Sequence, residues 1–178
     1  DLAFTMHMLY HLSETGTCAI VEFPGVLYRG GAEKKIREYL IKNNFVDTVI
    51  QLPANLFFGV GIATCIIVIK KNKKDNNILF VDASEECEKK GDKNKLEDKN
   101  QNRIVNAYQE RKEEQYFTKL VSNDEVLANG ANLSVSSFVE KEDKREVIDI
   151  VALNEEIEAL SKDVRNRSVE LDEMIKEL

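Results

Sequence analysis

Hydrophobic positions in the first 82 residues follow two spacings. Apolar residues at helical spacing predict helices, and short apolar runs predict strands. The predicted helices are 1–13 and 32–43, and the predicted strands are 18–23, 45–52, 62–69 and 78–81. We expect the strand over 18–23 to be of the buried type. The run over 62–69 is nearly all β-branched, which is typical of a strand buried on both faces. The chain therefore begins as an α/β domain.

The connections between these runs predict how the strands pair. A helix joins the first two strands, which makes them parallel neighbours or near-neighbours in one sheet. The nine-residue link 53–61 is too short for a crossover helix, so the third strand should run antiparallel. We therefore expect parallel strands closed by an antiparallel strand. Because ligands of such sheets bind beyond the carboxyl ends of parallel strands, loops 24–31 and 53–61 should share a functional face.

The pattern changes after residue 84. Residues 85–101 are strongly charged with a single Leu, so we expect a surface excursion or a linker, followed by a short helix over 102–112. The segment up to 145 is mixed. We therefore divide the chain into 1–84 as the end of a catalytic domain, 85–145 as a linker and mixed extension, and 146–178 as a C-terminal helix.

The last 29 residues carry a coiled-coil pattern. Apolar residues recur from Ile150 at alternating steps of three and four, interrupted only by Arg167. Such a stripe needs a partner helix, and we favour another chain over an intramolecular partner. The residues expected to contact it are Ile157, Leu160, Val164, Leu171 and Met174.

Composition narrows the class of protein. The net charge is −7, yet residues 1–80 carry 9 Lys and Arg against 7 Asp and Glu, so only the first half could approach an anion such as nucleic acid. We see no apolar run long enough for a membrane span and no secretory signal. The three Cys lack CxxC spacing, which indicates reduced thiols and a cytoplasmic protein. Because the chain starts at Asp1, we expect a fragment.

Three short patterns are candidates for chemistry. Phe57-Phe-Gly-Val-Gly61, with Asp82 further on, matches nucleotide-binding loops, but a strand rather than a helix should follow it, so we favour a chance match. His7 and His11 have metal-ligand spacing but no third His, and a structural role is favoured. Tyr28-Arg29-Gly30-Gly31, ahead of a helix, suits a phosphate oxygen, although an ordinary turn is the alternative.

Longer motifs carry a family resemblance. Phe23-Pro-Gly-Val-Leu-Tyr-Arg-Gly-Gly-Ala-Glu33, Gln51-Leu-Pro-Ala-Asn-Leu-Phe-Phe-Gly59, Asn132-Leu-Ser-Val-Ser-Ser137 and Arg145-Glu-Val-Ile-Asp-Ile150 occur in this order. Together they resemble the C-terminal portion of the modification subunit of type I restriction–modification systems, an adenine-specific DNA methyltransferase. The resemblance covers essentially the whole chain.

The resemblance implies a Rossmann-like methyltransferase sheet that transfers a methyl group from S-adenosylmethionine to the adenine exocyclic amine. The implied partners are double-stranded DNA, a specificity subunit, a nuclease subunit and a second modification subunit. Asn55, Phe57, Phe58 and Gly59 would form the target-base pocket, with a slight preference for Phe57 as the stacking ring. The alternative is that both Phe rings pack in the core. Tyr28, Arg29, Gly30 and Gly31 would contact DNA, and the C-terminal helix would dock on the specificity subunit.

The sequence also departs from the family. It has no Asn-Pro-Pro-Phe/Tyr motif and no family-type glycine-rich cofactor loop. We therefore expect no catalytic, cofactor-binding or metal-binding residue in this chain, and no methylation by it alone. The alternatives are a subunit-interaction module that acts through 150–178 and a self-contained nucleotide-binding domain that uses Gly59-Val-Gly61.

Overall fold

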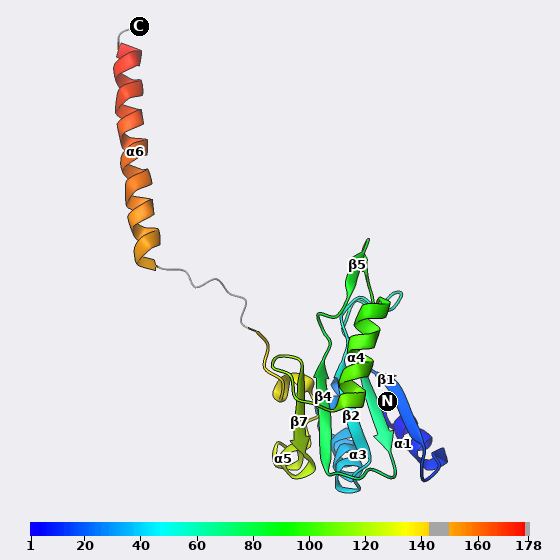
Figure 1. Cartoon of the computed structure of the whole chain (residues 1–178). Coiled ribbons are helices and arrows are strands. Elements are labelled where there is room, and N and C mark those ends of the chain that lie inside the picture. The colour runs from blue at the N-terminus through cyan, green and yellow to red at the C-terminus, as the bar shows by residue number, and fades with distance from the viewer. Residues whose placement is uncertain (143–149, 177–178) are drawn as a thin grey trace. The chain divides into compact units, whose positions relative to one another are not determined.

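A five-stranded mixed sheet lies at the centre of the first part of the chain in the computed structural model (Figure 1). The structure describes residues 1–142 and 150–176, and at 169–173 and 176 it describes the backbone alone. The chain divides into two compact units, Asp1–Glu142 and Asp143–Leu178. The elements of the first unit are α1 (Leu2–His11), β1 (Thr17–Glu22), α2 (Gly25–Tyr28), α3 (Gly31–Lys42), β2 (Val46–Gln51), β3 (Cys65–Lys70), β4 (Asn77–Asp82), β5 (Glu88–Lys90), β6 (Lys93–Lys95), α4 (Asp98–Glu110), β7 (Thr118–Ser122), α5 (Asn123–Ala128) and the 3₁₀ turn η1 (Val135–Ser137). The second unit contains α6 (Ile150–Lys176).

The sheet has the strand order β1-β3-β2-β4-β7. Its β2–β4 pair is parallel, and the other three pairs are antiparallel. The predictions that β3 runs antiparallel and that β1 and β2 are parallel near-neighbours are confirmed. The expected series of parallel strands closed by an antiparallel strand is wrong, because β3 folds back into the gap between β1 and β2 and a second antiparallel strand, β7, forms the edge.

Two apolar clusters pack on opposite faces of the sheet. Side chains alternate along β4, so that Ile78 and Phe80 lie in one cluster while Leu79 and Val81 lie in the other. The first cluster includes side chains from α1, α3 and α5, and the second includes Ile104 of α4. Helices thus cover both faces of the sheet, as expected for an α/β protein.

Two expectations about the first 31 residues need correction. The run over 18–23 reads as a buried strand, but β1 is an edge strand in which only Cys18 is fully buried. Its β-branched residues reflect strand propensity rather than burial on both faces. Within the expected loop 24–31, residues Gly25–Tyr28 form the short helix α2, whose Val26 and Leu27 are buried in the first cluster.

Of the two alternatives for the charged segment 85–101, the structure shows a surface excursion rather than a linker. The segment forms the β5–β6 hairpin and the start of α4, which begins four residues earlier than the helix expected from 102. A capping box fixes that start, because the backbone N–H of Glu97 donates to Asn100 Oδ1 (3.1 Å) and the Glu97 side chain accepts in return. Further on, β7 extends the sheet, and Leu133 and Phe138 are buried in the first cluster.

The predicted C-terminal helix is present as α6. Ile157, Leu160, Val164 and Met174 are exposed in the structure, and the Leu171 side chain lies outside the described residues. Arg167, which interrupts the apolar spacing, forms an ion pair with Asp163 one turn earlier (2.9 Å). The coiled-coil pairing stays a prediction. In the described part of the chain, no helix is long and apolar enough to cross a bilayer.

Candidate functional site

The carboxyl ends of β1, β2 and β4 meet at one edge of the sheet. In the strand register, Cys65 pairs with Glu22 on one side and with Gln51 on the other, and Gln51 pairs with Asp82. Loops 24–31 and 53–61 follow β1 and β2, so both leave this carboxyl edge, as the predicted topology requires. Figure 1 shows the β5–β6 hairpin and the loop after β2 extending beyond the same edge.

Hydrogen bonds across its base hold loop 53–61 closed. The Gln51 amide donates to the Thr64 carbonyl (3.0 Å), and the Leu52 N–H donates to the same oxygen (2.9 Å). At the tip, the Val60 N–H donates to the Phe57 carbonyl (3.2 Å). Gly59 has φ of 73° at the third position of that turn, where glycine is strongly favoured. The hydrogen-bonded turn therefore fixes the backbone positions of Phe57 and Phe58.

An open pocket of about 450 Å³ lies between this loop, the end of β1 and the start of α1. The half-exposed rings of Phe23 (46%) and Phe57 (42%) contribute to it. Thr64 is only 4% exposed, and its Oγ1 has no hydrogen-bond partner among the described residues. A buried hydroxyl without a partner is costly unless a ligand or water completes it. The lining residues are Asp1, Phe4, Val21, Glu22, Phe23, Phe57, Val60 and Thr64.

The four residues predicted for the target-base pocket lie in different environments. Phe57 lines the pocket, whereas Phe58 is fully exposed at the second position of the turn. Gly59 shapes the turn, and the Asn55 carbonyl accepts a hydrogen bond from the β6 backbone at Asn94 (3.1 Å). Neither Phe belongs to the core, which removes the packing explanation for both rings.

The thiol nearest the pocket is not an activated nucleophile. Cys65 is buried between Glu22 and Gln51, and its Sγ donates to the Glu22 carbonyl (3.4 Å). Burial, and then the negative charge of Glu22, raise the pKa of Cys65 to about 12. The thiol is therefore protonated at neutral pH, when only the thiolate would react.

The alternative of a nucleotide-binding glycine loop is rejected. Strand β3, not a helix, follows Gly61, so the helix N-terminus that would face an anionic ligand is missing there. Asp82 instead accepts a hydrogen bond from the Ser84 N–H (3.0 Å) in a local turn. The rings of His7 and His11 stack edge to face, with centroids 4.6 Å apart. Among the described residues there is no group of three His, Cys, Asp or Glu that could hold a metal.

The residues predicted to contact DNA lie around the start of α3. Tyr28 is exposed, and the Arg29 guanidinium folds back over Gly25, where an added Cβ would lie 2.8 Å from it. Gly31 has φ of 68°, and the space around Gly30 and Gly31 is open. None of these four residues is among the described lining of the Phe57 pocket. The backbone of the first helix turn is nevertheless accessible to a ligand.

The Asn132–Ser137 motif supports this loop structurally. The Leu133 N–H donates to the Leu27 carbonyl (2.9 Å). Asn132 closes its own turn, since its side chain donates to Ser137 Oγ (3.0 Å) and accepts from the Ser134 N–H (2.9 Å). The motif therefore packs behind the loop before α3 rather than forming part of the pocket.

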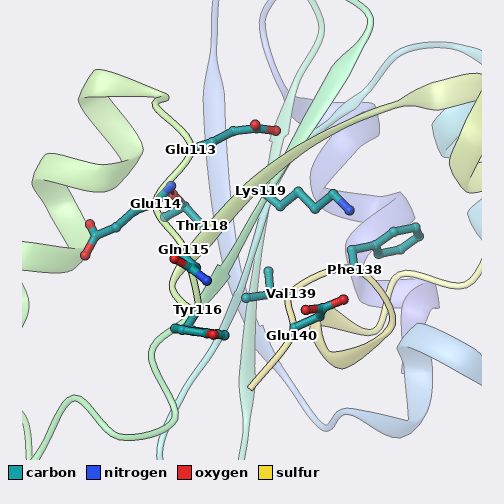
Figure 2. Close-up of a pocket in the computed structure, with 9 residues that line it drawn as sticks. All are labelled: Glu113, Glu114, Gln115, Tyr116, Thr118, Lys119, Phe138, Val139 and Glu140. Atoms are coloured by element: carbon teal, nitrogen blue, oxygen red, sulfur yellow. Dashed lines mark hydrogen bonds between the residues drawn. The ribbon is translucent and has the colours of Figure 1, made fainter. Parts of the chain in front are cut away.

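A second hollow, of about 420 Å³, lies beside the edge strand β7 (Figure 2). Figure 2 shows Tyr116 and Gln115 on one side of it, with Phe138 and Glu140 on the other. Glu113 and Glu114 add two further carboxylates, and Lys119 is the cation in its lining. This acidic lining is unsuited to phosphate, and none of the predicted site residues contributes to it.

Sequence reasoning missed Phe23 and Thr64 as pocket residues. The sequence signal for both is their position, because each is one residue beyond a strand end at the carboxyl edge. It also missed the β5–β6 hairpin, whose sequence signal is Gly91-Asp92 as a two-residue turn between charged residues.

Comparison with known proteins gives consistent matches. Residues 1–147 match the family model described as N-6 DNA Methylase. The chain is 44% identical to the type I restriction enzyme MpnII methylase subunit of Mycoplasma pneumoniae over 99% of this chain and 33% of that protein. It is 33% identical to the MjaVII methylase subunit of Methanocaldococcus jannaschii over 98% of this chain and 30% of that one. The chain thus spans about a third of the length of these relatives.

A solved structure supports the same grouping. The type I restriction–modification methyltransferase subunit from Streptococcus thermophilus superposes with a TM-score of 0.77 at 41% identity, covering 79% of this chain and 30% of that one. The EcoKI M protein has a TM-score of 0.65 at 19% identity over 94% of this chain and 44% of that chain, a likeness in fold. The chain belongs to the N-6 DNA methylase family and is homologous to the methylase subunits of type I restriction enzymes.

Proposed function

We propose that this chain is the part of an adenine-specific DNA methyltransferase, the methylase subunit of a type I restriction–modification enzyme, that receives the extruded target base. The observation that carries the proposal is the pocket at the carboxyl edge, whose lining includes Phe23, Phe57 and the buried Thr64, a residue whose hydroxyl has no hydrogen-bond partner among the described residues. A base taken out of the helical stack needs an aromatic surface and hydrogen-bonding groups to replace its neighbours. This pocket offers both.

The roles follow from the geometry. Phe57 would stack on the base, and Thr64 Oγ1 would bond a heteroatom of its ring. Gly59 would hold the turn that presents Phe57, while Phe58 projects outward and Asn55 anchors the loop. Tyr28, Arg29 and the open backbone at Gly30 and Gly31 would contact DNA phosphate beside it.

The methyl donor of this family is S-adenosylmethionine. The Gly59–Gly61 turn does not fit it, since strand β3 rather than a helix follows Gly61. We therefore assign no cofactor-binding residue and no catalytic residue in this chain, and expect that the chain by itself binds no S-adenosylmethionine and transfers no methyl group. Residues outside this chain would complete the reaction in a cytoplasmic enzyme.

The implied partners besides DNA are a specificity subunit, a nuclease subunit and a second copy of the modification subunit. We assign the C-terminal segment 146–178 to docking on the specificity subunit through Ile157, Leu160, Val164, Leu171 and Met174. The side chains of Ile157, Leu160, Val164 and Met174 are exposed, and that of Leu171 lies outside the described residues. Docking is one role within the methyltransferase, and a chain that acts only as an interaction module is not favoured.

Substitution of the two neighbouring Phe residues tests the proposal. In the methylase assembled with its specificity subunit, Phe57→Ala should slow single-turnover methylation about 10- to 100-fold, because base–aromatic stacking contributes about 1–3 kcal/mol. It should also reduce the fluorescence change of 2-aminopurine at the target position. Phe57→Leu should recover part of the rate. Phe58→Ala is the matched control, and a larger loss in Phe58→Ala than in Phe57→Ala would reject the assignment.

A further inference from the structure

The β5–β6 hairpin is a lysine-rich projection beside the Phe57 loop. Its three residue pairs are closed by a two-residue turn in which Gly91 has φ of 65°. Four of the eight residues from 88 to 95 are lysine, and Lys89, Lys90 and Lys95 are exposed. The hairpin thus concentrates positive charge within a region of the sequence that is acidic overall.

Among the described residues, these hairpin lysines form no ion pair with a carboxylate. Lys90 and Lys93 lie directly opposite each other in the hairpin, an arrangement of like charges that destabilises a strand pair. Acidic residues at the hairpin base are already engaged, since Glu88 pairs with Lys99 and Glu86 pairs with Arg103. An anion bound along the hairpin would relieve the repulsion between the lysines.

Hydrogen bonds attach the hairpin to the loop that carries Phe57. The Asn94 side chain donates to the Ala54 carbonyl (2.9 Å), and its backbone N–H donates to the Asn55 carbonyl (3.1 Å). Lys93 Nζ also approaches the Phe57 carbonyl (3.4 Å). A two-stranded ribbon this short is not stable alone, so these contacts hold its position. The lysines therefore have a fixed place relative to the pocket.

We propose that the β5–β6 hairpin binds the phosphate backbone of duplex DNA next to the extruded adenine, a proposal that rests on the function proposed above. The lysines are spread along a projecting ribbon, which suits the extended row of phosphates on a DNA strand. Lysine acts there as a point charge without base preference. The hairpin supplies affinity and register, while sequence is read elsewhere in the enzyme.

The salt dependence of DNA binding tests the hairpin. The altered protein carries Lys89→Gln, Lys90→Gln and Lys95→Gln in the methylase assembled with its specificity subunit. The matched control carries Lys42→Gln, Lys74→Gln and Lys112→Gln, which removes the same charge from exposed lysines elsewhere. Binding is followed by fluorescence anisotropy of a duplex containing the target site. Each phosphate contact contributes about 0.9 to the slope of log K against log salt, so three lost contacts should lower the slope by about 2–3.

The expected result is a weaker, less salt-dependent complex for the hairpin variant, with the control close to the unaltered enzyme. A variant with Arg at the same three positions should retain binding, which separates loss of charge from misfolding. If the hairpin and control variants bind alike, the hairpin proposal is overturned. The proposed function is judged separately, by methyl transfer to DNA in the unaltered enzyme and by the comparison of Phe57→Ala with Phe58→Ala.

Discussion

Arg37 joins three segments behind the candidate site. The side chain is 1% exposed, and it lies on α3. Its Nε donates to the Ala131 carbonyl and its Nη1 donates to the Val26 carbonyl, both at 2.8 Å. Burial lowers the pKa of Arg37, against the opposing effect of Glu33 and Glu38, yet an arginine stays charged at neutral pH. Arg37→Met would leave two buried carbonyl groups unpaired.

The magnitude follows from these two hydrogen bonds. A hydrogen bond to a charged group contributes about 1.5–3 kcal/mol to stability. The variant also no longer carries the desolvation cost of a buried guanidinium, which offsets part of the loss of the two hydrogen bonds. We expect Arg37→Met to lower the free energy of unfolding by about 2–4 kcal/mol, a large part of a typical 5–15 kcal/mol. Arg37→Lys, which keeps the charge but loses the two-pronged donor, should cost less.

Urea denaturation followed by circular dichroism measures the effect. Lys42→Met is the matched control on the same helix, because that side chain is 62% exposed and pairs with Glu38, which is itself 36% exposed. Exposed pairs contribute little, so the control should lose about 1 kcal/mol or less. Equal losses in the two variants would refute the assignment of Arg37 as the support of this region.

Two further predictions concern pH and subunit contact. Burial lowers the pKa of Lys73 to about 8, with Asp75 and Asp47 opposing and Arg111 and Lys70 reinforcing the shift. Between about pH 8 and pH 10.4 the unfolded chain therefore binds more protons than the folded one, so Lys73 should make the free energy of unfolding rise with pH. Lys73→Met should remove this contribution when denaturation curves are compared across that pH range. Equal slopes of the free energy of unfolding against pH in the two proteins would contradict this. Leu160→Glu should abolish co-purification with the specificity subunit while far-ultraviolet circular dichroism is unchanged. Ser161→Glu, one residue off the apolar stripe, should keep the complex, and loss in both variants would contradict a stripe-specific contact.

The features of the fold that depend on local sequence patterns, such as the positions of strands, could be predicted from the sequence. The apolar run over 78–81 becomes β4, because a strand buried on both faces reads as a continuous apolar run. The predicted strand over 45–52 becomes β2, although Asp47 and Thr48 interrupt its apolar residues. The shared edge of loops 24–31 and 53–61 also follows from connection length alone. By contrast, the order of strands was not predictable, since a short link sets the direction of β3 but not the gap into which it folds.

The hairpin and the pocket depend on contacts between distant residues. The β5–β6 hairpin is charged on both strands, and its stability comes from Asn94, which bonds a loop about 40 residues earlier. Thr64 reads as one residue of an apolar run, and only the register of β3 against β1 brings it beside Phe23. Neither feature has a periodic signal within its own segment, so pattern reasoning could not find them.

Methyl transfer itself tests the central claim most directly. The enzyme is assembled with its specificity subunit and incubated with duplex DNA and S-adenosylmethionine labelled with tritium in the methyl group. We expect label in N6-methyladenine, and a loss of most of that label in Phe57→Ala. Label in cytosine, or no label in DNA despite a fully assembled complex, would contradict it.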